Sequence, residues 1–158
     1  MLGNKARTNW CFRKGLLKSV SPILKKSDEH IQKAKHNLKA ADYNIKGGFS
    51  DWAISQTYYA TYHALLAVLY RFGLESTNHE CTISAVEGLI GTGKLKIDKK
   101  VIAFIRTTEQ MKAKDAKSLR EEFQYGTKTE ASKAILDELL MNSKGMIEEI
   151  EIALQEER

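Results

Sequence analysis

The stretch from Trp52 to Tyr70 reads WAISQTYYATYHALLAVLY and contains no Lys, Arg, Asp or Glu. As an α-helix it would be roughly 30 Å long at about 1.5 Å per residue, which is the diameter of a small domain. Apolar residues occur at helical spacing around most of its circumference, so we expect a central helix that is packed on several sides. One strip of small residues predicts the close approach of another helix or of a second subunit: Ala53, Thr57, Ala60, Ala64 and Ala67.

A stretch of this length without charge also fits a membrane span. Polar side chains within the stretch argue against a membrane span, because lipid hydrocarbon offers them no hydrogen-bond partners. These residues are Ser55, Gln56, Thr57, Thr61 and His63. No second candidate span exists, and the basic N-terminus lacks the apolar core of a secretory signal. We therefore expect no membrane association.

The two cysteines, Cys11 and Cys81, are too few for a disulfide framework. They favour a reducing, cytoplasmic setting.

Long periodic segments and a single proline in 158 residues predict an all-α fold, an antiparallel helical bundle of about five helices. The first expected bundle helix begins at Ser27 and ends at Gly47, and His30 and His36 on it are expected to face solvent. The others are expected to begin at Ser50, at Thr77, at Asp98 and at about Thr129. This gives a basic N-terminal arm, 1–26, which includes a short amphipathic helix, and a bundle domain, 27–158.

Charge is distributed unevenly along the chain. Residues 1–26 contain seven Lys or Arg and no acidic residue, and residues 94–120 contain nine basic and three acidic residues. Residues 121–158, in contrast, contain four basic and ten acidic residues. This polarity suits an anionic partner over one face, although Lys-rich helices that are merely solvated would give the same pattern.

The segment NIKGGFSDWAISQTYYATYHALLAVLYRFG resembles the HEPN domain, whose members commonly have a helix, a short glycine-bearing turn and a tyrosine-rich helix. The NHECTIS stretch after Gly73 and the Arg120 to Tyr125 segment fall where such proteins carry a His-containing helix start and an arginine motif. The resemblance covers roughly residues 27–155. It implies a helical bundle that forms a homodimer and pairs with a minimal nucleotidyltransferase as toxin and antitoxin.

The ribonuclease members of that family carry Arg, four to six residues, and then His, supplied by both subunits. Arg120 would be this arginine by resemblance, but Tyr125 stands where the histidine is expected, and no His follows His79. The planar fork of Arg120 suits phosphate. Tyr125 is a poor base, with an unperturbed pKa near 10, but it can donate a hydrogen bond or stack on a base. The strict ribonuclease motif is therefore absent.

Three further residues are candidates for binding a nucleotide or RNA: Tyr59, His63 and His79. His63 either is buried and bonded to a tyrosine hydroxyl or the backbone, or faces a cleft and transfers protons. His79 either belongs to a helix cap or binds phosphate at a helix N-terminus. His79 and Cys81 alone do not make a zinc site, so we expect no metal and no cofactor.

Three hypotheses follow. The first is a HEPN homodimer that binds RNA or a nucleotide in a basic cleft and associates with a nucleotidyltransferase-type protein. The second is a divergent, metal-independent HEPN endoribonuclease that uses Arg120, Tyr125 and either His63 or His79. The third is a dimeric scaffold without nucleic acid. The lost histidine and the two basic segments favour the first.

Overall fold

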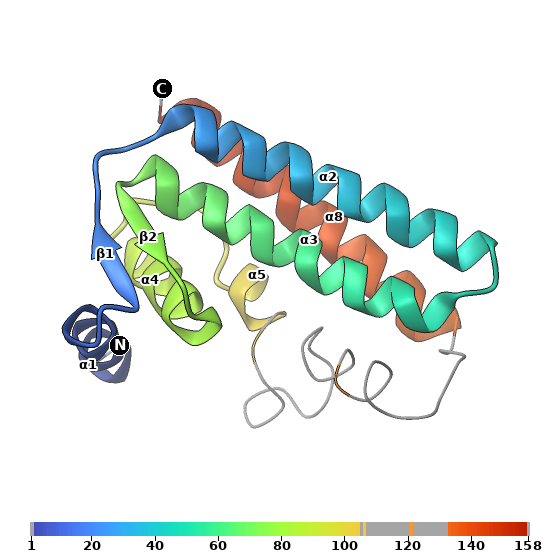
Figure 1. Cartoon of the computed structure of the whole chain (residues 1–158), viewed down its shortest axis with the longest axis horizontal. Helices are drawn as coiled ribbons and strands as arrows, with labels where there is room; N and C mark the ends of the chain where they lie inside the picture. The colour runs from blue at the N-terminus through green and yellow to red at the C-terminus, as the bar shows by residue number, and fades with distance from the viewer. Residues whose placement is uncertain (1, 105, 107–120, 122–132, 158) are drawn as a thin grey trace.

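The computed structural model describes residues 2–104, 106, 121 and 133–157. In chain order the elements are α1 (Leu2–Arg13), β1 (Leu17–Ser19), α2 (Leu24–Lys46), α3 (Ser50–Arg71), β2 (Leu74–Ser76), α4 (His79–Gly91), α5 (Lys100–Ala103) and α8 (Lys133–Glu156). Three long helices, α2, α3 and α8, lie side by side, and α1, α4 and the strands gather at one end of them (Figure 1). The prediction of an all-α fold is confirmed.

The helices α2 and α3 form an antiparallel hairpin, as predicted. The turn passes through Gly48, whose φ of 86° is one that glycine adopts without strain. All five small residues of the predicted strip on α3 are buried inside the chain. The Ser27 hydroxyl of α2 donates a 2.7 Å hydrogen bond to the carbonyl oxygen of Ala67 on α3, so the two helices approach closely there. Ser27 does not cap α2, because the helix begins three residues earlier than predicted, at Leu24.

The core lies between α3 and its neighbours. Ile54 and Leu65 of α3 are fully buried, as is Ile150 of α8. At one end of the bundle, Arg71 Nη1 donates a 2.8 Å hydrogen bond to the carbonyl oxygen of Leu154, which fixes the last turn of α8 to the end of α3. The predicted start of this last helix, Thr129, lies outside the described residues.

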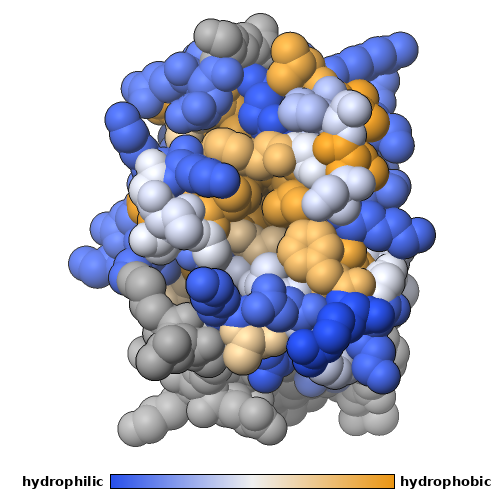
Figure 2. Space-filling model, turned by 90° about the vertical axis from the view of Figure 1, so that its left-hand side faces the viewer, coloured by the Kyte–Doolittle hydropathy of each residue, from blue (hydrophilic) through white to orange (hydrophobic). Residues whose placement is uncertain are grey.

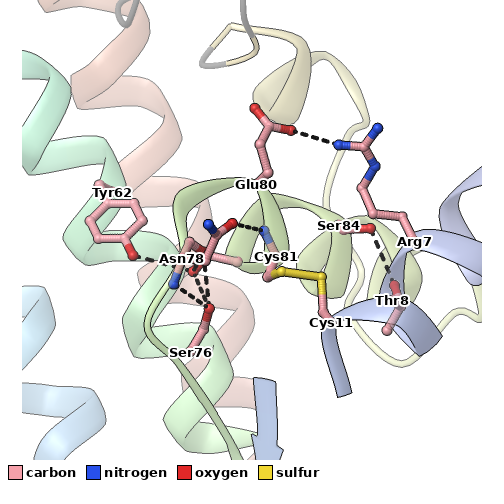
Figure 3. The surroundings of a disulfide bond; sticks show 10 residues. Arg7, Thr8, Cys11, Tyr62, Ser76, Asn78, Glu80, Cys81 and Ser84 are labelled. Carbon is pink, nitrogen blue, oxygen red and sulfur yellow. Dashed lines mark hydrogen bonds and ion pairs between the residues drawn. A yellow bond between two sulfur atoms is a disulfide. The ribbon is translucent and has the colours of Figure 1, made fainter. Parts of the chain in front are cut away.

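The N-terminal arm is attached through both strands and helices. Leu17 of β1 pairs with Ser76 in a short antiparallel sheet, and α1 packs on α4. A disulfide joins Cys11 of α1 to Cys81 of α4 across 70 residues, with 5.8 Å between their Cα atoms (Figure 3). The expectation of reduced thiols is therefore wrong. The predicted apolar side of α1 is also wrong at Trp10, which is 43% exposed.

Two helix starts differ from the predicted ones. The side chain of Asn78, not Thr77, caps α4 by accepting a hydrogen bond from the Cys81 backbone N–H. The helix predicted from Asp98 begins at Lys100, whose backbone N–H donates to the Asp98 carboxylate. Over the part of the chain that the structure describes, no helix has both the length and the hydrophobicity that a membrane span requires.

Candidate functional site

Two predicted site residues, Arg120 and Tyr125, lie outside the described residues. The hypothesis that they act on RNA stays a prediction. The other three, Tyr59, His63 and His79, are described, and the structure places His63 and His79 in different side-chain clusters.

His79 is the first residue of α4 and links that helix to α3. Its Nδ1 atom is hydrogen-bonded to the Tyr58 hydroxyl, and its ring stacks on Tyr62 with 4.2 Å between ring centroids. The Tyr62 hydroxyl lies 3.3 Å from Thr82 Oγ1, and burial raises the pKa of Tyr62, so this phenol stays protonated at neutral pH. The Asn78 side chain already accepts a hydrogen bond from the backbone N–H of Cys81 in the first turn of α4 (Figure 3). The cluster therefore positions α4 against α3.

His63 pairs with another histidine, not with a tyrosine or the backbone as predicted. Its Nδ1 lies 2.9 Å from Nδ1 of His30, which stacks in turn on Tyr70 at 5.3 Å. Burial, followed by the charges of His30 and Lys33, lowers the pKa of His63 to about 4. Burial likewise lowers the pKa of His30, which does not face solvent as expected. At neutral pH both rings are neutral, and one donates to the other across the α2–α3 hairpin.

Tyr59 is the candidate with the most accessible ring. It is 40% exposed and meets Tyr58 edge to face, with 5.5 Å between ring centroids. An exposed aromatic ring is a platform on which a nucleobase can stack. Among the described residues no three His, Cys, Asp or Glu side chains are close enough together to hold a metal ion.

The two basic segments meet in the folded chain. A cavity of about 750 Å³ lies between α1, β2, α4 and α5; we call it the α1–α4 cavity. Lys5 of α1 lines it together with Lys94 and Lys99, which follow α4. These three lysines, the basic rim, are all exposed, as are the neighbouring Lys96 and Lys100. Figure 2 views the face that carries α1 and the strands, and it shows apolar side chains around a central hollow with hydrophilic ones at its edge.

The distribution of charge along the sequence identified both basic segments, but it did not predict that they lie side by side in the folded chain. Residues 1–26 and the lysines after α4 are separated by most of the bundle in sequence, and they come together because α1 packs on α4. The disulfide fixes that packing, and a second α1–α4 contact is the ion pair at 3.7 Å between Arg7 and Glu80 (Figure 3). The sequence carried one signal for this arrangement, the presence of one cysteine in α1 and one in α4.

Comparison with known proteins gives one positive finding. The family model described as HEPN domain matches residues 27–153. The search of curated proteins found no match. The matched range contains α3, β2, α4 and α5 and most of α2 and α8, so it includes the hairpin with the tyrosine-rich helix and the His79 cluster. The chain therefore belongs to the HEPN domain family.

Proposed function

We propose that this HEPN protein binds single-stranded RNA or a nucleotide through the basic face around the α1–α4 cavity. The observation that carries the proposal is the convergence of Lys5, Lys94 and Lys99 on one cavity, from two segments that are distant in sequence. Exposed cations gathered on one face raise the local concentration of a polyanion and form ion pairs with its phosphates. Membership of the family supports the same class of ligand.

The exposed cations extend beyond the cavity itself. All seven Lys and Arg residues of the segment 1–26 are exposed, and so are Lys96 and Lys100 beside the basic rim. The exposed ring of Tyr59 lies on α3, outside the basic segments, so we assign the phosphate contacts to the lysines and leave stacking as a separate contribution.

The test is binding of a fluorescent single-stranded RNA, measured by anisotropy at several salt concentrations. If four phosphates are contacted, the affinity should fall about 50-fold between 50 and 200 mM salt, since the slope of log K is about −0.7 per phosphate. The double variant Lys96→Glu/Lys100→Glu should bind more weakly and with a smaller slope. Lys33→Glu/Lys39→Glu, at two exposed lysines on α2 outside both basic segments, is the matched control and should bind like the unchanged protein.

Affinity that does not depend on salt concentration would refute the basic face as the RNA site. A loss of affinity in Lys33→Glu/Lys39→Glu as large as in Lys96→Glu/Lys100→Glu would refute it as well. Cleavage is followed in the same samples in the presence of EDTA. RNA that is cut by the unchanged protein but not by Arg120→Ala would instead support the endoribonuclease hypothesis, with Tyr125→Phe testing the second residue.

The proposed assembly is a homodimer that associates with a nucleotidyltransferase-type protein in a toxin–antitoxin-like pair. It rests on the family resemblance. Light scattering of the purified protein measures the first part, and a mass of one chain at all concentrations would contradict it. Co-expression with a minimal nucleotidyltransferase measures the second part: a stable complex after purification and relief of any growth inhibition are the expected results.

A further inference from the structure

We propose that the α1–α4 cavity binds a small amphipathic anion, an unbranched aliphatic chain that carries one carboxylate or phosphate head. The cavity has a volume of about 750 Å³, which lies within the range of about 300–1,000 Å³ that is typical of small-molecule sites. This inference concerns a ligand other than RNA and does not depend on RNA binding.

The interior of the cavity is aliphatic. Its apolar lining consists of Leu74, Ala85, Leu89, Ile90, Ile102 and Ala103, with no aromatic ring among the described lining residues. Proteins that hold a nucleobase without reading its edges commonly use an aromatic side chain on which the base stacks. An interior made of methyl and methylene groups lacks such a platform, but it provides the environment that an alkyl chain gains by leaving water. The lining therefore favours an aliphatic occupant over a base.

The charge at the cavity selects the head group. Among the described residues, four basic ones line the cavity, Lys5, Lys94, Lys99 and Arg106, against a single acidic one, Glu87. Arg106 and Glu87 form an ion pair with each other. The three lysines of the basic rim form no ion pair with any of the residues that the structure describes. An aliphatic interior beside ammonium groups that pair with no described carboxylate matches a molecule with an apolar tail and an anionic head.

The cavity is also fixed in shape by a covalent bond. The wall that α1 supplies contains Lys5 and Thr8, and Cys11 one turn further along α1 is bonded to Cys81 of α4. Thr8 Oγ1 also lies 3.2 Å from Ser84 Oγ on α4 (Figure 3). Walls held in place before binding reduce the ordering that a ligand must otherwise impose.

Titration calorimetry with hexanoate, octanoate and decanoate tests the apolar part of the site. The affinity should rise about fourfold per added methylene group, hence about 16-fold for each step of two. Decyl phosphate has a tail that is longer by one methylene group, so it should bind about fourfold more tightly than decanoate if the site does not distinguish the two heads. A larger ratio indicates a preference for phosphate, and a smaller ratio indicates a preference for carboxylate. Decyltrimethylammonium has a tail that is longer by one methylene group and the opposite charge, and it should bind at least tenfold more weakly than decanoate despite the longer tail.

Gly88 allows the cavity to be filled without disturbing the fold. It lines the cavity on α4, and a Cβ atom added to it would meet no atom within 4 Å. Gly88→Leu should therefore abolish decanoate binding. Gly145→Leu is the matched control, since Gly145 is on α8, is equally open to a side chain and does not line the cavity. Both substitutions raise helix propensity, so a difference between them reports on the cavity.

Several results would overturn the proposal. These are no binding of any anionic probe, affinity that does not depend on chain length, equal binding of decanoate and decyltrimethylammonium, or decanoate binding by Gly88→Leu that equals that of Gly145→Leu. The RNA measurement remains separate. Gly88→Leu keeps the lysines of the basic face, so it should bind RNA normally, and each of the two functions can fail without the other.

Discussion

Breaking the Cys11–Cys81 bond should detach α1 from α4 before the bundle unfolds. The bond closes a loop with a sequence separation of 70, and in the chain-entropy model such a cross-link contributes about 4.4 kcal/mol at 25 °C. The ion pair between Arg7 and Glu80 is largely exposed on the Arg7 side and contributes at most about 1 kcal/mol. The hydrogen bond between Thr8 and Ser84 contributes about 1 kcal/mol more. The disulfide thus contributes more to stability than these two contacts together.

The two tryptophans allow the arm and the bundle to be followed separately. Trp10 lies on α1 and Trp52 on α3, and each keeps about half of its surface buried. Trp52→Phe leaves Trp10 as the reporter of the arm, and Trp10→Phe leaves Trp52 as the reporter of the bundle. In the oxidised protein, urea unfolding followed by fluorescence should give one midpoint for both. With an m-value of about 2 kcal/mol per molar urea, reduction should lower the Trp10 midpoint by up to about 2 M, with a smaller shift for Trp52.

Hydrogen exchange provides an independent measurement. Amides of α1 should exchange faster after reduction, while those of the central part of α3 should keep their protection, because local opening of the arm leaves the core intact. The double variant Cys11→Ala/Cys81→Ala should reproduce the reduced protein without reductant. Midpoints that stay at their oxidised values for both tryptophans, in a sample whose thiols are shown to be free, would refute this account of the arm.

Three further perturbations follow from the core, a turn and the histidine pair. Ile150→Ala should destabilise the protein by about 2–5 kcal/mol because this side chain is fully buried, whereas Ile152→Ala, at a position that is 58% exposed on the same helix, should stay within about 0.5 kcal/mol in urea unfolding. Gly48→Ala should lower the free energy of unfolding by about 1 kcal/mol, and Gly73→Ala should lower it by more. Both residues have positive φ, but a Cβ at Gly73 would lie 2.6 Å from a backbone oxygen, whereas one at Gly48 would meet nothing within 4 Å. Because the pKa of His63 is lowered to about 4, the unfolded chain binds more protons than the folded one between about pH 6.5 and pH 4. Stability should therefore fall as the pH falls through that window. His63→Asn should flatten this part of a profile of melting temperature against pH, and an unchanged profile would contradict the pairing.

Local pattern predicted the elements whose causes are local. The uncharged stretch became α3 because apolar side chains recur around its whole circumference, and Gly47 and Gly48 turned the chain back to make the α2–α3 hairpin. The strip of small residues predicted a close helix contact, which the bond from Ser27 to the Ala67 carbonyl confirms. These features depend on spacing within a few turns, which a sequence displays directly.

Contacts between distant segments were not predictable in this way. The His30–His63 pair depends on how α2 and α3 are aligned, and a helical pattern says which face is buried but not which residues of two helices meet. The partnership of Cys11 with Cys81 depends on where α1 docks, and an exposed Trp10 shows that hydrophobicity alone does not decide that position. For the candidate site, the sequence identified the basic segments, whereas the cavity between them arises from packing.

The arm lies outside the matched range of 27–153, yet it supplies a wall of the α1–α4 cavity, one of its rim lysines, a strand of the sheet and half of the disulfide. Properties inferred from the family concern residues 27–153 and therefore do not cover the wall of the cavity that α1 supplies. The cavity and the basic face also share α1, so a change that detaches the arm should weaken both ligands. Filling the cavity at Gly88 should weaken the aliphatic anion alone. Comparing reduction with Gly88→Leu thus separates what the arm contributes as a wall from what it contributes as a source of positive charge.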